Sequence, residues 1–139
     1  MKCFTKLGFI VLFLSSIGAE NALAALPLQV GVYRGPGSRY IQIAEKENRI
    51  CFKNFSSKGV IVASVAADTN RKDFYIINGF DGTFLLQQDT DTVLFGPVNQ
   101  LIKYVADYGF TRDLDNDLQE CLSSHKPFFK QKSGGRGSR

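Results

Sequence analysis

Several residue types are scarce in this chain of 139 residues, which has no tryptophan, one histidine, one methionine and three cysteines. The single histidine, His125, stands directly before a basic C-terminal stretch. A Ser-His-Asp or Cys-His catalytic group needs its histidine held rigidly beside its partners, and a zinc site needs several histidine or cysteine ligands. The composition therefore argues against both, and we expect a protein that is not an enzyme and holds no metal or cofactor.

Calcium is a better candidate than zinc, because Asp113, Asp115 and Asp117 alternate as the first ligands of an EF-hand loop do. The sixth position of that loop should be glycine and is Leu118, and the twelfth should be glutamate and is Ser124. Acidic residues in the first turn of a helix explain the run better, since the helix dipole favours negative charge there.

Long apolar runs are also lacking, apart from residues 7–14. That run follows Lys2 and Lys6 and precedes the small-residue pattern Ala-Leu-Ala at 22–24. It is too short for a membrane span and has the length of a signal-peptide core. We expect a signal peptide over residues 1–24, cleavage after Ala24, and a secreted or periplasmic protein without a later transmembrane segment; an uncleaved anchor is the alternative.

The cysteines follow from this expectation, because removing the signal peptide also removes Cys3. Cys51 and Cys121 remain, and an even pair in an exported chain predicts one disulfide. That bond would close a loop of about 70 residues, which the chain-entropy account values at about 4 kcal/mol. Two free buried thiols are the alternative.

The net charge of +4 is unevenly distributed. Residues 126–139 carry five basic residues and no acid, whereas residues 25–125 carry ten basic and twelve acidic residues. We expect a single β-rich domain over 25–125 and a basic, disordered tail over 126–139. Outside the tail, basic and aromatic residues do not cluster as a nucleic-acid footprint requires, so no nucleic-acid partner is expected.

Residues 40–55 carry the clearest local pattern, two β-type runs at 40–44 and 49–53 around a polar linker. Pairing Ala44 with Arg49 sets Ile43 opposite Ile50 and Ile41 opposite Phe52, which makes one face apolar. The opposite face then carries Tyr40, Gln42, Cys51 and Lys53.

About seven short strands, spaced near ten residues apart, are predicted at 30–34, 40–44, 49–53, 60–65, 74–78, 83–88 and 92–95. Every connection is short enough for antiparallel neighbours. The fold class is therefore mainly β: an antiparallel meander of about six to eight strands forming a small barrel or curved sheet, with a C-terminal helix.

The segment 98–108 fits either a short helix or a strand. The next segment, 113–123, predicts a helix that Thr111 or Asp113 could cap. Its apolar face would carry Cys121, so the disulfide would hold the helix against the hairpin face that carries Tyr40 and Gln42.

One loop is a candidate anion-binding site. Gly35 and Gly37 lie between Arg34 and Arg39, so two guanidinium groups flank exposed backbone amides that could meet a phosphate or carboxylate. A plain loop is the alternative, because the GxxxxGK[ST] pattern is lacking and no helix follows.

Three pieces of the chain carry a resemblance: Gly31-Val32-Tyr33-Arg34-Gly35, Asn48-Arg49-Ile50-Cys51-Phe52 and Cys121-Leu122. In this order the chain resembles a group of small secreted bacterial proteins of unknown function, which implies a two-cysteine design and no activity. It is also similar to lipocalin-like barrels and to small periplasmic lysozyme inhibitors, which combine an antiparallel meander with an N-terminal glycine-aromatic strand. The tryptophan usual in the lipocalin Gly-x-Trp motif is missing.

The leading functional hypothesis is an exported binding module that recognises a protein, such as a hydrolase it inhibits, or a small apolar ligand. The alternative is a structural envelope-associated protein whose basic tail touches anionic polymer or lipid. An apolar or hydrated cavity inside the barrel would favour a small ligand, whereas a filled interior with an exposed apolar patch would favour a protein partner.

Overall fold

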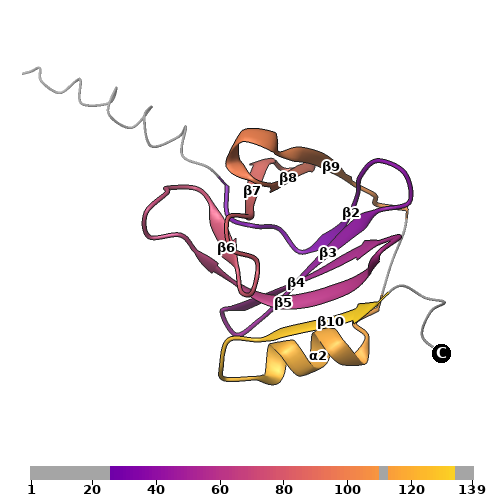
Figure 1. The fold of residues 1–139 in the computed structure, drawn as a ribbon, viewed down its shortest axis with the longest axis vertical. Helices are drawn as coiled ribbons and strands as arrows, with labels where there is room; N and C mark the ends of the chain where they lie inside the picture. The colour runs from indigo at the N-terminus through magenta and orange to yellow at the C-terminus, as the bar shows by residue number, and fades with distance from the viewer. Residues whose placement is uncertain (1–25, 110–112, 134–139) are drawn as a thin grey trace, which may run out of the picture.

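The structure, a computed structural model, describes residues 26–109 and 113–133 and contains a closed antiparallel barrel of eight strands (Figure 1). Each strand pairs with the next along the chain, and the eighth returns to pair with the first. The predicted mainly β barrel is thereby confirmed. The barrel strands are β2 Gly31–Arg34, β3 Tyr40–Lys46, β4 Arg49–Ser56, β5 Gly59–Ala67, β6 Tyr75–Ile77, β7 Phe84–Asp89, β8 Thr92–Gly96 and β9 Ile102–Ala106.

The segment 98–108, for which the sequence allowed a short helix or a strand, contains a 3-10 turn followed by a strand. A single 3-10 turn, η2 Val98–Gln100, follows Pro97 and leads directly into β9. In Figure 1, β3, β4 and β5 form one wall and β7, β8 and β9 the opposite wall, with β6 between them on one side. Outside the first wall lie the helix α2 Asn116–Ser123 and the strand β10 Phe129–Ser133.

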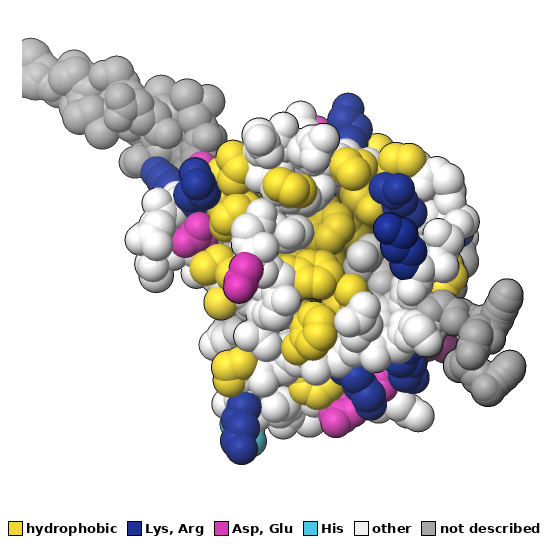
Figure 2. All heavy atoms as spheres, in the orientation of Figure 1, with side chains coloured by type: hydrophobic (Ala, Val, Ile, Leu, Met, Phe, Trp, Pro, Cys, Tyr) yellow, Lys and Arg dark blue, Asp and Glu magenta, His cyan; other side chains and the backbone are white. Residues whose placement is uncertain are grey.

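The barrel interior is filled by side chains, as expected for eight strands. Figure 2 shows hydrophobic side chains in the space between the two walls. Aromatic rings link the two walls, since the centroids of the Phe52 and Phe95 rings lie 5.4 Å apart. Phe95 also packs against Tyr104 of its own wall, with ring centroids 6.0 Å apart. The buried interior cluster comprises Leu28, Tyr33, Ile41, Ile43, Phe52, Ala63, Val65, Ile77, Leu85, Val93 and Tyr104.

The β3–β4 hairpin has the predicted faces but a different register. Ile43 pairs with Phe52, two residues away from the predicted partner Ile50, so that prediction was wrong. Glu47 and Asn48 both adopt positive φ angles, 52° and 70°, and form a two-residue turn that lets the strands pair up to Lys46. A shift of two residues keeps every side chain on its face.

Helix α2 covers the outer face of β3, β4 and β5, the face predicted for it. A second apolar cluster lies there, formed by Ala44, Cys51, Val62, Leu118, Cys121 and Leu122. The Cys51–Cys121 disulfide is present, with both cysteines fully buried, so the predicted pairing is confirmed.

The helix begins later than predicted, because Asp115 is its N-cap. One Asp115 carboxylate oxygen accepts the Leu118 N–H at 2.9 Å, and the other pairs with the ammonium group of Lys53, a largely buried side chain. Burial raises the pKa of Asp115, but these two partners outweigh it and the net pKa is lowered. The alternative cap Asp113 lies before the helix, and Thr111 lies outside the described residues.

The prediction of a disordered tail from residue 126 was wrong for Phe129–Ser133, which forms β10 and pairs with Gly59–Ala63 of β5. The reason is a difference in strand length: β5 has nine residues and β6 only three, so β6 covers one end of the β5 edge. β10 satisfies the backbone groups at the other end. Residues 134–139 of that tail and the predicted signal peptide, 1–24, lie outside the described residues.

Two lysines of β10 bind the acidic side of α2. Lys130 and Lys132 each contact an Asp117 carboxylate oxygen, at 3.0 and 2.9 Å, and Lys130 also contacts Glu120 at 3.2 Å. Hydrogen bonds from Lys132 and then Lys130 lower the pKa of Asp117 below its ordinary value of 3.8. The ion pairs therefore join the last helix to the last strand.

We predict that the double substitution Cys51→Ala/Cys121→Ala lowers the free energy of unfolding by about 4 kcal/mol, because the disulfide restricts a loop of about 70 residues in the unfolded chain. Urea titration of the oxidised protein and of the variant measures this. Wild-type protein unfolded and refolded in reductant should match the variant. A loss below about 1 kcal/mol would contradict the entropic account.

We also predict that the urea midpoint falls between pH 5 and pH 3, and falls less in Asp117→Asn. A carboxyl group whose folded pKa is depressed stabilises the fold above its unfolded pKa, and this contribution is lost as the pH drops through the folded value. Asp81→Asn, which removes an exposed carboxylate from the β6–β7 loop, is the matched control. If the urea midpoint falls by the same amount in wild type and in Asp117→Asn over this pH range, the Asp117 ion pairs contribute nothing to the stability of the fold.

Candidate functional site

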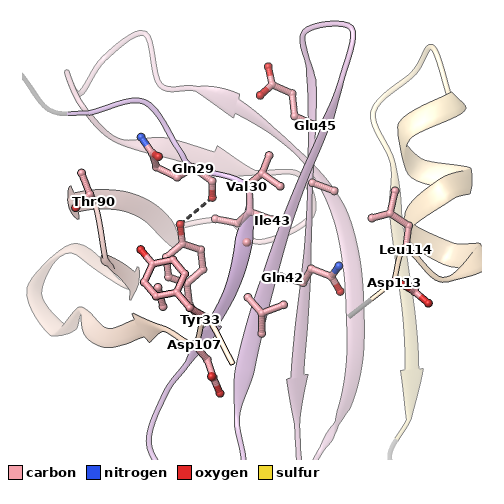
Figure 3. A pocket seen from close by; sticks show the side chains of 15 residues that line it. Gln29, Val30, Tyr33, Gln42, Ile43, Glu45, Thr90, Asp107, Asp113 and Leu114 are labelled. Carbon is pink, nitrogen blue, oxygen red and sulfur yellow. Dashed lines mark hydrogen bonds between the residues drawn. The ribbon is translucent and has the colours of Figure 1, made fainter. Parts of the chain in front are cut away.

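A groove of about 570 Å³ lies on the outside of the barrel along β2 and β3 (Figure 3). Its floor is formed by side chains that point outward from these strands, Val32, Gln42 and Ala44, all of them buried. One wall is Asp107–Tyr108, directly after β9, and the other is Asp113–Leu114, directly before α2. We call this the β2–β3 groove.

The groove forms because β2 and β9 separate early. Only two residue pairs join these strands, Tyr33 with Ala106 and Arg34 with Val105. The Asp107 N–H still donates to the Val32 carbonyl oxygen at 2.9 Å, and the chain then leaves the barrel wall. Gly31 and Val32 therefore have no paired residue in β9, and Asp107 and Tyr108 form a wall of the groove beyond the end of that strand.

A buried polar network fixes the edge of the groove that precedes β2. The Tyr33 hydroxyl donates to the Gln29 carbonyl oxygen at 2.8 Å, the dashed line in Figure 3. The Gln87 side chain, 1% exposed, accepts the Gln29 N–H at 2.9 Å and donates to the Asp89 carbonyl oxygen at 2.8 Å. Burial raises the pKa of Tyr33, so its hydroxyl keeps the proton that it donates. The groove edge is thus preorganised.

The charged residues that line the groove are all acidic: Glu45, Asp107 and Asp113. Arg34 stands beside it and its Nε donates to Asp107 at 3.1 Å. Tyr108 donates its hydroxyl to Asp91, and this hydrogen bond raises the pKa of Tyr108.

A second cleft, of about 470 Å³, has the opposite charge. It lies beside the β3–β4 turn and is lined by Arg49, His125 and Lys126, with Glu47 as its one acid. Arg49 donates to the carbonyl oxygens of Cys121 and Lys126, both at 2.6 Å, and so anchors the segment between α2 and β10. This structural use of Arg49 makes the second cleft the weaker candidate.

The predicted anion-binding loop is the β2–β3 connection. The Gly35 N–H donates to the Arg39 carbonyl oxygen at 3.1 Å, and the Arg39 N–H to that of Pro36 at 3.4 Å, so two loop amides bind within the loop. A Cβ on Gly35 would lie 2.4 Å from the Tyr104 ring, whereas Gly37 has φ +67° and open space around it. Gly35 therefore has a packing role, and anion binding by the loop stays a prediction.

Arg34, the first arginine of that prediction, faces the groove wall. Besides its ion pair with Asp107, its guanidinium lies 5.9 Å from the centre of the Tyr40 ring. The structure thus separates the roles of Arg34 and Arg39, because the side chain of Arg39 hydrogen-bonds to the Tyr104 hydroxyl and lowers its pKa against the larger, opposing effect of burial.

Sequence reasoning missed the groove because its residues come from separate segments that only the closed barrel brings together. One signal was available at Gln87: it follows Leu85 by two residues in β7 and so occupies an inward position that a polar side chain can fill only with partners.

Comparison with protein-family models, with curated proteins and with solved structures finds no match to this chain. The disulfide-bonded small barrel agrees with the likeness to lipocalin-like barrels in fold alone. Within residues 26–109 and 113–133, no helix is long and apolar enough to cross a membrane.

We predict that Gly35→Ala lowers the free energy of unfolding by about 1–3 kcal/mol, because the added methyl group must displace the buried Tyr104 ring. Ser38→Ala, at an exposed position of the same loop, should change it by less than about 0.5 kcal/mol. Urea titration compares the two. Equal values for both variants would refute the packing role of Gly35.

Proposed function

We propose that this protein is an exported binding module that recognises a protein partner through the β2–β3 groove. The observation that carries the proposal is the contrast between a barrel interior filled with side chains and a groove on its outside. Barrels that carry a small ligand hold it inside. Here a ligand would have to displace the buried rings of Tyr33, Phe52 and Tyr104.

The rim of the groove exposes large side chains of the kind that protein interfaces use. Val30 is 62% exposed, Tyr108 is 79% exposed and Leu114 is 41% exposed. All three line the groove, so they are gathered around one depression. Apolar and aromatic groups gathered around a fixed depression favour recognition of another protein.

Export is supported by the disulfide, since such bonds persist outside the cytosol. It is supported further by the predicted signal peptide. A module in that location meets its partner in the periplasm or outside the cell.

The alternative, a structural role for the basic tail, has less support. Lys130 and Lys132 are paired with Asp117 and Glu120 of α2, so these two cations already have partners within the protein. A structural role would require envelope association that is lost at high salt and on deletion of residues 134–139.

Site-specific photo-crosslinking in the cells that produce the protein tests the proposal. A photoreactive phenylalanine analogue replaces Leu114 in the groove or, as the control, Val98 in η2, which is similarly exposed at 39%. We expect a discrete adduct with another protein from position 114 and not from position 98.

Three outcomes would overturn the proposal: no adduct from position 114, the same adduct from both positions, or an adduct with a second copy of this chain. Unchanged urea midpoints for both variants establish that neither result reflects misfolding.

A further inference from the structure

The carboxylates of the β2–β3 groove are placed to meet several groups of one extended partner. In Figure 3, Glu45 and Asp107 lie at opposite ends of the groove with Gln42 between them, and Asp113 lies on the α2 side. A chain that runs along β2 and β3 passes all three acids.

Two of these acids form no ion pair within the part of the chain that the structure describes. Arg34 pairs with Asp107, but among residues 26–109 and 113–133 no ion pair includes Glu45 or Asp113. A partner that covers the groove displaces water from these carboxylates, and a covered carboxylate without a counter-charge is unfavourable. The partner must therefore bring its own positive charge.

The floor between the acids adds a second requirement. Val32 and Ala44 present apolar side chains there, and Val30 and Leu114 extend that surface at the rim. Lysine and arginine match this arrangement, because their aliphatic stems cover apolar surface while the charged end reaches a carboxylate.

We propose that the segment bound in the β2–β3 groove is a basic stretch of polypeptide in which lysine or arginine alternates with apolar side chains. This inference rests on the proposed function and names the chemistry of the partner. The second cleft, lined by Arg49, His125 and Lys126, disfavours the same segment, so the charge pattern directs it to the groove.

Fluorescence anisotropy with three labelled octapeptides tests the inference on the oxidised, mature protein. The peptides alternate leucine with lysine, glutamine or glutamate. At 20 mM NaCl the lysine peptide should bind about tenfold tighter than the glutamine peptide, as two new ion pairs of under 1 kcal/mol each would give. The glutamate peptide should bind weakest, and the lysine preference should shrink to about twofold at 500 mM NaCl.

Two double variants test whether the preference for the lysine peptide depends on the acids of the groove. Glu45→Gln/Asp113→Asn should reduce the preference for lysine to about twofold. Asp68→Asn/Asp81→Asn, which makes the same change in net charge away from the groove, should keep it. Equal binding of the lysine and glutamine peptides, no binding of the lysine peptide, or an unchanged preference in Glu45→Gln/Asp113→Asn would each overturn the inference.

Failure here is distinguishable from failure of the proposed function. A protein adduct from position 114 whose crosslinked segment lacks lysine and arginine would refute the basic partner and leave the protein-binding module standing. The absence of any such adduct would refute the module itself.

Discussion

The structure depends on closing eight short strands around an interior that holds a cluster of buried side chains. The interior of an eight-stranded barrel is just wide enough for side chains, and the rings of Phe52 and Phe95 meet across it with centroids 5.4 Å apart. Because side chains occupy the interior, a binding surface has to lie on the outside of the barrel. The β2–β3 groove lies there between Asp107–Tyr108, where the chain leaves β9, and Asp113–Leu114, directly before α2.

Local patterns in the sequence were sufficient for the faces and for the disulfide. Alternation placed Ile41, Ile43 and Phe52 inward, and helical spacing placed Cys121 on the buried face of α2. The hairpin register was not predictable from alternation alone, since a shift of two residues leaves the faces unchanged. The observed register goes with the two-residue turn of Glu47 and Asn48, both at positive φ. The groove could not be predicted, because it depends on where β9 leaves β2, a property of barrel closure.

The C-terminal region shows how a polar sequence can be ordered by partners elsewhere. Phe129–Ser133 has one apolar residue, and composition therefore favours disorder. Its backbone nevertheless pairs with the open edge of β5, and its lysines form ion pairs with Asp117 of α2. Composition describes what a segment can bury by itself and says nothing of the edge that another strand leaves available.

The division of one β5 edge between β6 and β10 has a consequence for biogenesis. β5 begins at Gly59, whereas its edge partner β10 begins only at Phe129. Residues 59–63 therefore have only one paired side until residues 129–133 have been synthesised, and during that interval they present an open strand edge to any other unfolded chain. Pairing with β10 closes this edge against association with neighbouring chains.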